Sequence, residues 1–325
     1  MILPYTLRLV CLCFASFFLV HAAVGVAVWA GAPSAMRIGE SMRPRSGARF
    51  LLALRLLPFA LAAFVIAGLC VPSYLWLETN EATERVGLAC CAMALLGALV
   101  CANSLVRGVR ALFISVRQAR ACKREGRLSD KGNVLPVTIM NSNAPVLALA
   151  GLVRPSVIVS RGVLETLSGE ELEAALEHER AHRISRDNWK RLALFLAPEI
   201  FPFTQAFTRL NRCWAKLIEW AADDEAAAGD SRRSVSLAAA LIHLAQMGRS
   251  PGVSPLSSSF VGNDRDLCTR VDRLLRLAPT RANAPRRPRI ALGIAAALAA
   301  AVTVAAIIRP VTFLSVHRLL EQLLR

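Results

Sequence analysis

The chain has 325 residues, of which 55% are hydrophobic, and its mean hydropathy is +0.46 with a formal net charge of +16. This hydropathy is higher than that of soluble globular domains and favours a membrane protein. The positive charge would also suit a nucleic-acid binder, but the arginines cluster beside apolar runs and no nucleic-acid-binding motif is present. We therefore expect no direct nucleic-acid binding and interpret the charge as a signal of membrane topology.

Four apolar stretches predict membrane-spanning helices. The first three cover residues 9–29, 56–77 and 86–106, and each supplies about the ~20 residues that a spanning helix needs. A fourth span is expected at residues 290–308, followed by a short extracytoplasmic tail at residues 309–325. The sequence thus predicts an α-helical integral membrane protein that contacts the lipid bilayer through four helices.

Arginine-rich segments set the expected orientation of these spans. They follow the first and third apolar stretches and precede the fourth. Because cytoplasmic loops carry an excess of Lys and Arg, we place these segments in the cytoplasm and the N-terminus and tail outside, in a bacterial inner membrane. Cleavage of the first stretch as a signal peptide after Ala32 is the alternative, but its apolar run exceeds the ~7–15 residues of a signal sequence.

Residues 107–289 form a predicted cytoplasmic domain inserted between the third and fourth spans. Short apolar and β-branched runs at residues 134–140, 146–150 and 157–160 predict strands, because Asn-rich and Arg-Pro breaks separate them. The remainder shows mainly helical patterns, including an amphipathic helix over residues 264–277. We therefore expect a mostly α, α+β domain.

A helix predicted to begin after Ser168 carries the motif that dominates this domain. Ser168 is a good N-cap, and Glu171 three residues later completes a capping box. His178, Glu179 and His182 then form an HExxH pattern on the helix. Residues four apart lie on one helix face, so the two imidazoles can share a zinc ion while Glu179 acts on its water. The alternative is an exposed helix that spells HExxH by chance.

A third metal ligand is needed, and the chain offers few candidates. Ser185 and Asn188 stand where the metzincin pattern requires Gly and His, so that subclass is excluded. No CxxC pair is present, which argues against a thiolate zinc site and a disulfide framework. Downstream, Glu219 would complete the ligand set, and Asp223 one turn later could accept the N–H of a ligating histidine. The alternative places both acids on a solvated helix face.

Four segments resemble the membrane-embedded zinc metallopeptidases of the BlaR/MecR type, the antirepressor proteases of beta-lactam response systems. They are VLALAGLVRPSVIVSRGVLETLSGEEL, HERAHRISRDN, EWAAD and RVDRLLRL. The resemblance spans roughly residues 134–277, and HtpX-like and CAAX-prenyl-type proteases share a similar metal motif. It implies a zincin-like peptidase domain with one zinc ion per chain. Arg186 and Asp187 match the extension of the family's motif.

The expected reaction is hydrolysis of a peptide bond by a zinc-activated water, with Glu179 as general base. Many zinc peptidases with a glutamate ligand add a Tyr or His as a second oxyanion donor. Tyr5 and Tyr74, the two tyrosines of the chain, lie at membrane segments, so His243 or Arg186 would have to serve. The alternatives are a packed helix residue for His243 and a helix-terminal role for Arg186.

Three functions are compatible with these residues. The first is an active zinc endopeptidase that cleaves a protein or peptide, either as a signalling protease on a cytoplasmic transcriptional repressor or as a housekeeping protease of the HtpX-like type. The second is a catalytically silent membrane scaffold, and the third is a membrane-tethered nucleic-acid binder. The intact motif favours the first. Penicillin-sensing family members carry a sensor domain after the last span, where this chain has residues 309–325, so we expect no direct beta-lactam sensing.

Overall fold

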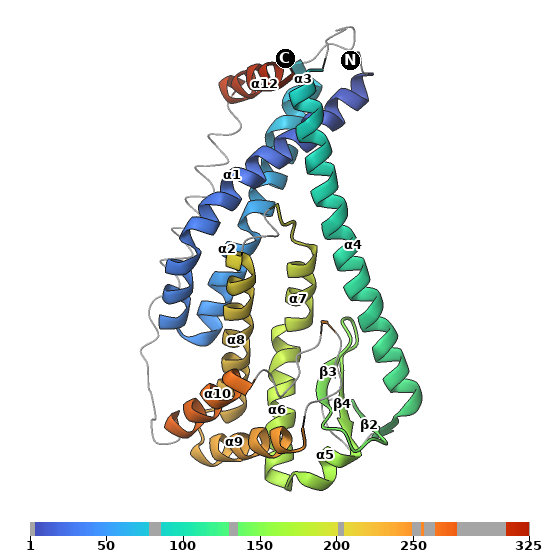
Figure 1. Ribbon diagram of the computed structural model, residues 1–325, viewed down its shortest axis with the longest axis vertical. Helices are drawn as coiled ribbons and strands as arrows, with labels where there is room; N and C mark the ends of the chain where they lie inside the picture. Colours follow the sequence, from blue (N-terminus) through green and yellow to red (C-terminus); the bar gives the residue numbers. More distant parts are fainter. Residues whose placement is uncertain are drawn as a thin grey trace.

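The chain folds into an elongated molecule whose two ends differ in composition (Figure 1). Long apolar helices converge at the end that holds both termini, and shorter helices with a small sheet form the other end. The computed structural model describes residues 4–77, 86–129, 136–200, 205–248, 255–256, 264–277 and 310–324.

Three helical stretches are long and apolar enough to cross a membrane. They are α1 (Tyr5–Ser41), the run of α2 (Pro44–Val65), a π-helical turn η1 (Ile66–Cys70) and α3 (Val71–Leu77), and α4 (Leu88–Glu125). The first three predicted spans coincide with these helices, but each helix continues into the neighbouring arginine-rich residues. The expected fourth span, residues 290–308, lies outside the described residues.

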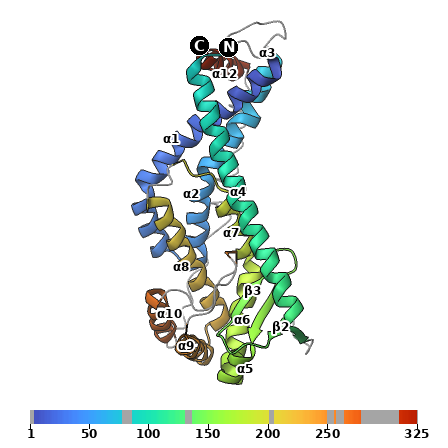
Figure 2. The ribbon, with the colours of Figure 1, turned by 45° about the vertical axis from the view of Figure 1, so that its right-hand side comes forward.

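Helices α1 and α4 cross closely because a glycine stands at their contact. A Cβ atom at Gly97 of α4 would collide with the carbonyl oxygen of Phe14 on α1. Small residues are the usual means by which membrane helices bring their backbones together. We therefore attribute the tight crossing seen near the N-terminal end of α1 to Gly97 (Figure 2).

A four-stranded sheet follows α4. Its strands are β1 (Arg127–Ser129), β2 (Val137–Met140), β3 (Leu147–Ala150) and β4 (Ser156–Ser160), in the order β1-β2-β4-β3. The β2–β4 pair is parallel, and the β1–β2 and β3–β4 pairs are antiparallel. The three predicted strands therefore form, the short β1 is added to them, and β3 lies at an edge of the sheet.

The remaining helices pack beside the sheet and between the long helices. They are α5 (Arg161–Thr166), α6 (Gly169–Ser185), α7 (Asp187–Leu196), α8 (Gln205–Ala227), α9 (Ser231–Gln246), α10 (Asp264–Leu277) and α12 (Pro310–Leu324). Buried side chains of β3, β4, α6, α9 and α10 share one apolar core. Helix α6 contacts β3, α8 and α9, so its sides are covered along most of its length.

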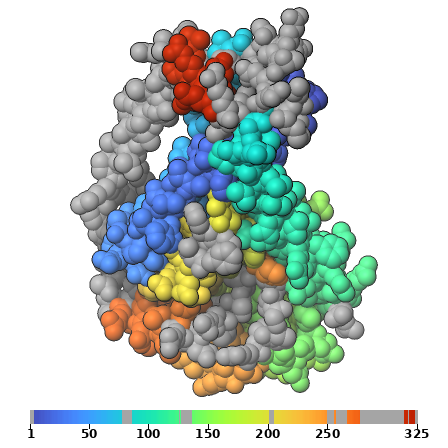
Figure 3. All heavy atoms as spheres, turned by 45° about the horizontal axis from the view of Figure 1, so that its top comes forward, coloured from blue at the N-terminus to red at the C-terminus, as the bar shows by residue number. Residues whose placement is uncertain are grey.

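Helix α8 also reaches into the group of long helices. Leu210, Trp214 and Leu217 pack against Leu51 of α2 in a second apolar cluster. Figure 3 shows part of α8, in yellow, framed by the blue α1 and the teal α4 on that face. Helix α8, which follows the HExxH segment and α7, is therefore in direct contact with the candidate membrane spans.

A cluster of charges joins the spans to the segment that leaves α7. Arg55 of α2 and Arg107 of α4 donate to the two carboxylate oxygens of Glu199, at 2.6 and 2.7 Å. The His21 ring of α1 lies 3.2 Å, from its Nε2, from the carbonyl oxygen of Pro198. Arg55 is only 2% exposed, so loss of Glu199 would leave its charge buried without its partner. Three long helices are thus tied to the C-terminal end of α7, whose other end begins at Asp187.

Helix α12 packs at the end of the molecule that holds the N-terminus. Leu320 is buried with Leu12, Tyr74 and Val86, and α12 contacts α3 more than any other element. The tail predicted at residues 309–325 is therefore largely helical, and it lies at the end opposite to the sheet (Figure 1).

Candidate metal centre

Helix α6 is fixed at its N-terminus by the capping box that the sequence predicts. The Ser168 hydroxyl accepts a hydrogen bond from the Glu171 backbone N–H at 3.3 Å, and the Glu171 carboxylate accepts one from the Ser168 N–H at 2.9 Å. The helix ends at Ser185, and Arg186, with φ 54°, turns the chain into α7. This local geometry presents the HExxH residues in the covered middle and last turns of α6.

His178, His182 and Glu219 come together between α6 and α8. Both histidine side chains are fully buried, and their Nε2 atoms lie 3.1 Å apart. The Oε2 atom of Glu219 lies 3.4 Å from the Nε2 of His178 and 3.6 Å from the Nε2 of His182. Within the part of the chain that the structure describes, this is the group of side chains whose donor atoms could hold one metal ion.

The spacing of these donor atoms fits zinc. In a tetrahedral site with bonds of ~2.0–2.2 Å, neighbouring donor atoms are about 3.3–3.6 Å apart. The observed separations run from 3.1 to 3.6 Å. The Glu219 Oε2 atom is also buried and makes no regular hydrogen bond among the described residues, so it is available as a metal ligand.

Each histidine is oriented by a carboxylate on its other ring nitrogen. The Nδ1 of His178 lies 2.9 Å from Oδ1 of Asp223, and the Nδ1 of His182 lies 2.8 Å from Oδ2 of Asp187. A carboxylate that accepts the Nδ1–H leaves the Nε2 lone pair available to a metal. Two acids thus direct the two imidazoles toward the same point.

Arg270 closes the site from α10. Its side chain is buried and donates a two-point hydrogen bond to Asp223, at 2.8 Å from Nε and 2.7 Å from Nη2. Its Nη1 lies 3.4 Å from Oε2 of Glu219, and Arg191 of α7 lies 3.4 Å from the other oxygen of that carboxylate. A planar guanidinium in this arrangement fixes the orientation of a carboxylate as well as its charge. Arg270 therefore holds the acid behind His178 and also faces Glu219.

The charges around the site shift the pKa values of its ionisable groups. Burial would raise the pKa of Asp223, but Arg270 and His178 lower it to about 2. Burial would likewise raise the pKa of Glu219, yet His182 and His178 hold it well below its ordinary value. Burial would lower the pKa of His182, whereas the neighbouring carboxylates of Glu219, Asp187 and Glu179 raise it to about 10. The site therefore stabilises positive charge among its acids.

Glu179 differs from the other acids of the site because it pairs with no side chain among the described residues. Its side chain is fully buried and makes no hydrogen bond with another side chain within the described residues. Burial raises the pKa of its carboxyl, and the neighbouring His182 and His178 oppose this increase. A carboxyl with a raised pKa, beside a metal site, is suited to accept and return a proton near neutral pH.

An open cavity of about 370 Å³ borders His182. Its walls come from the end of β3 with the loop that follows, and from the corner between α6 and α7. Asn188 donates to the carbonyl oxygen of Gly151 at 2.8 Å, and the Trp189 indole donates to that of Leu152 at 3.0 Å. Helix α7 therefore fixes the loop after the edge strand, beside an opening that a peptide side chain could enter.

Two further predicted residues lie outside the cluster. Arg186 is exposed at the α6–α7 corner and lines the cavity that borders His182. His243 of α9 is 43% exposed, and its Nδ1 lies 3.3 Å from the carboxylate of Glu171 in the first turn of α6. The structure thus brings Asp223 and Asp187 to the histidines, leaves Arg186 at the rim, and places His243 at the other end of α6.

Arg270 is a site residue without a predicted role, although its position in the sequence carries a signal. Leu267, Val271 and Leu274 form the apolar face of an amphipathic helix, and Arg270 lies three residues after the first and four before the last. It therefore falls on the apolar face, where a charge must find a buried partner. That position predicts a buried ion pair, but the helical pattern of α10 does not reveal which acid accepts it.

Comparison with known proteins covers the residues of this cluster. A search of curated proteins found no match. The family model described as BlaR1 peptidase M56 matches residues 74–274, which is more than half of the chain and includes the whole cluster from His178 to Arg270. The chain therefore belongs to the BlaR1 peptidase family, whose membership marks it as a membrane-associated metallopeptidase.

Proposed function

We propose that the protein is a zinc metalloendopeptidase that holds one zinc ion per chain through His178, His182 and Glu219. The observation that carries the proposal is the convergence of these three donor atoms. Each histidine contacts a carboxylate through its other ring nitrogen, and the nearby Glu179 carboxyl pairs with no side chain among the described residues. A silent scaffold would have no need of such an acid. The membership of the chain in a metallopeptidase family supports the same reaction.

The residues of the site have different roles in the proposed peptide hydrolysis. A zinc ion in this position supplies Lewis-acid chemistry, which polarises carbonyl groups and lowers the pKa of water. Glu179 accepts a proton during attack on the scissile carbonyl and delivers it to the leaving amine. Asp223 and Asp187 keep the imidazoles oriented, and Arg270 keeps Asp223 in place. Burial of these groups excludes bulk water from the proton transfer.

The metal assignment predicts about one zinc per chain in protein purified in detergent. His182→Ala and Glu219→Ala should each lower the zinc content at least tenfold, because each removes one of the three donor atoms. His243→Ala should retain the full content, since His243 lies beside Glu171 rather than in the cluster. Elemental analysis after gel filtration measures the result. Zinc lost in His243→Ala but retained in Glu219→Ala would show that the ligands are assigned wrongly.

We further propose that the peptidase elements face the cytoplasm of a bacterial inner membrane. The arginine-rich segments beside the apolar helices support this orientation. The apolar run at residues 290–308, which lies outside the described residues, is the sequence feature that supports a fourth span.

Topology reporters test this arrangement directly. Fusions after Gly132 and Gly252 should report cytoplasm, and fusions after Thr79 and at the C-terminus should report outside. The C-terminal fusion tests the fourth span, because three spans would leave it in the cytoplasm. A signal from outside at Gly132 would contradict both the orientation and a cytoplasmic substrate.

For the physiological role we propose regulatory proteolysis of a cytoplasmic, repressor-like protein. The support is the family, whose name refers to a beta-lactam-response regulator, together with the proposed cytoplasmic face. Proteins that accumulate in cells carrying Glu179→Gln, relative to the unchanged protein, identify the substrate. A DNA-binding protein among them supports the regulatory role. Accumulation of damaged membrane proteins alone would instead assign a housekeeping role.

A further inference from the structure

The two oxygens of the Glu219 carboxylate face different partners. Oε2 lies 3.4 Å from the Nε2 of His178 and 3.6 Å from the Nε2 of His182, so it is the oxygen in position to bind a metal. Oε1 instead accepts a hydrogen bond from Nη2 of Arg191, at 3.4 Å. The nearest nitrogen of Arg270 faces Oε2, which leaves Oε1 to Arg191.

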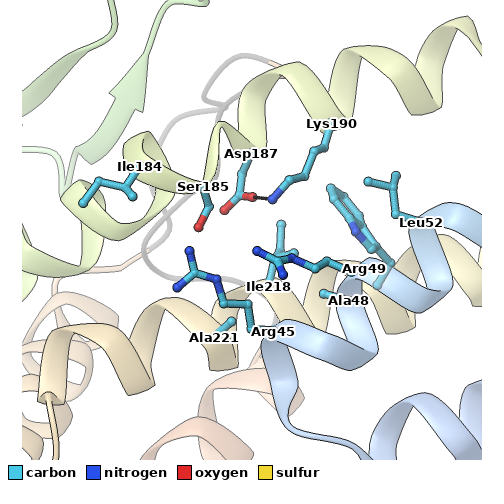
Figure 4. Close-up of a pocket in the computed structure, with 11 residues that line it drawn as sticks. Arg45, Ala48, Arg49, Leu52, Ile184, Ser185, Asp187, Lys190, Ile218 and Ala221 are labelled. Carbon is cyan, nitrogen blue, oxygen red and sulfur yellow. Dashed lines mark hydrogen bonds and ion pairs between the residues drawn. The ribbon is translucent and has the colours of Figure 1, made fainter. Parts of the chain in front are cut away.

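The two aspartates of the site divide their oxygens in the same way. One oxygen of each contacts the Nδ1 atom of a ligand histidine, Oδ2 in Asp187 and Oδ1 in Asp223. The other oxygen accepts from a cation. Lys190 donates to Oδ1 of Asp187 at 2.7 Å, as Figure 4 shows, and the Nε of Arg270 donates to Oδ2 of Asp223 at 2.8 Å. Each carboxylate of the site therefore turns one oxygen toward the histidines and is held through the other by a cation.

The guanidinium of Arg191 is held in place by two groups of α8. Arg191 follows Asp187 by four residues, so both side chains lie on the face of α7 that meets the metal cluster. Its guanidinium carbon lies 5.8 Å from the centroid of the Trp214 ring, within the range of a cation–π contact. The side chains of Arg191 and Glu219 are only 18% and 16% exposed, so water and salt screen this pair less than a surface ion pair.

We propose that Arg191 is a positioning residue for Glu219, which holds Oε1 so that only Oε2 binds the metal. The inference rests on the proposed zinc site and adds a residue to it. A carboxylate has two oxygens that can both bind one metal ion, and a donor on one of them keeps that oxygen engaged. With one donor atom from each of the three ligands, a four-coordinate zinc retains a position for water.

The charge and the hydrogen bond of Arg191 predict opposite effects on zinc affinity. A cation beside the site repels Zn²⁺, so by charge alone its removal would strengthen metal binding. A hydrogen-bonded partner of a ligand supports binding, and its loss typically lowers metal affinity ~10–100-fold. The direction of the change therefore decides between a positioning role and electrostatic competition with the metal.

Cobalt substitution reports the number of donor atoms directly. Full-length protein in detergent is freed of metal with a chelator and reloaded with Co²⁺, which absorbs visible light much more strongly when four-coordinate than when five-coordinate. The wild-type protein should show the strong bands. Arg191→Gln has a shorter side chain and Arg191→Met has no donor, so in both variants Oε1 becomes free to bind as a further donor. Both should show clearly weaker bands.

Zinc affinity, measured by competition with a chromogenic chelator, should fall ~10–100-fold in the same two variants. Arg191→Lys keeps the charge and a donor, and should restore the strong bands and most of the affinity. Unfolding midpoints of the metal-free proteins show which variants are folded, and either Arg191→Gln or Arg191→Met is sufficient for the test. Bands of wild-type strength, or tighter zinc binding, in the folded variants would overturn the proposal. A lower unfolding midpoint with unchanged bands and affinity would make the contact purely structural and would also contradict it.

Lys216→Met is the matched control. Lys216 lies on α8 one turn before Glu219 and pairs with Glu40 of α1 at 2.9 Å, and its side chain is 27% exposed. Its loss removes the same charge from a partly exposed ion pair that does not include a residue of the metal cluster. The bands and the zinc affinity should match those of the wild type. Equal changes in Lys216→Met and Arg191→Met would show a general effect of charge and would overturn the positioning role.

Failure of this inference is distinguishable from failure of the proposed zinc site. Wild-type protein that binds neither Zn²⁺ nor Co²⁺ would contradict the site itself, and the role of Arg191 with it. Wild-type protein that binds one ion per chain, together with Arg191 variants that match it in bands and affinity, would contradict the role of Arg191 alone.

Discussion

Glu179→Gln is expected to reduce proteolysis by ~10²–10⁴-fold, the usual contribution of a general acid–base group, while zinc content stays at the wild-type level. The amide preserves the shape of the side chain but cannot accept a proton. The donor atoms of the metal cluster lie on His178, His182 and Glu219, so the metal site does not need Glu179. Cleavage of the proteins that accumulate in cells carrying the variant provides the measurement, together with elemental analysis.

Glu177→Gln is the control on the same helix. Glu177 is 40% exposed and pairs with Arg180 at 3.1 Å, a surface contact without a role at the metal cluster. Its variant should cleave at nearly the wild-type rate. If Glu179→Gln were as active as the unchanged protein on every substrate found, the proposed proton transfer would be wrong, however closely the three ligands approach one another.

The local patterns of the sequence predict much of this fold. The apolar and β-branched runs give β2, β3 and β4, and the capping box at Ser168 places the start of α6. The strand β1 has the sequence Arg-Leu-Ser, which is too short and too polar to produce an alternating pattern. Apolar runs likewise locate the spans but not the helix ends, because arginines are good helix formers and let α2 and α4 extend beyond their apolar parts.

The sequence predicts the site residues that lie together on one helix, but it does not predict contacts between residues on different helices. His178 and His182 can be paired from their spacing alone, because four residues return to one face of a helix. The meeting of Glu219 with them depends on the packing of α8 against α6, for which the sequence offers only a candidate. The Arg55–Glu199 pair joins residues 144 positions apart, so no local pattern could have indicated it.

The two acids that contact the histidines, Asp187 and Asp223, differ in the same way. Asp187 follows His182 by five residues, so the α6–α7 corner brings them together over a short distance in sequence. Asp223 reaches His178 from another helix and is itself held by Arg270 from a third. The sequence predicts a histidine partner for Asp223 but no cation, because the apolar pattern of α10 carries no information about the residues that face it.

The pairing of Arg270 with Asp223 predicts a large loss of stability when the cation is removed. Arg270→Gln leaves the Asp223 carboxylate, which is 1% exposed, without the charge that compensates its burial. Breaking a buried pair in this way typically lowers the free energy of unfolding by ~3–5 kcal/mol. We expect a correspondingly lower unfolding midpoint for zinc-free protein in detergent, and a zinc affinity reduced ~10–100-fold because the support of His178 is disturbed.

The neighbouring pair on the same two helices is a matched control. Arg273 of α10 and Asp224 of α8 make an equivalent contact, but their side chains are 22% and 36% exposed, so water compensates the loss of either charge. Arg273→Gln should therefore cost less than ~1 kcal/mol. It should also leave zinc binding unchanged, because Asp224 does not contact the histidines. Equal losses of stability and zinc affinity in the two variants would show that Arg270 anchors α10 in general rather than the carboxylate behind His178.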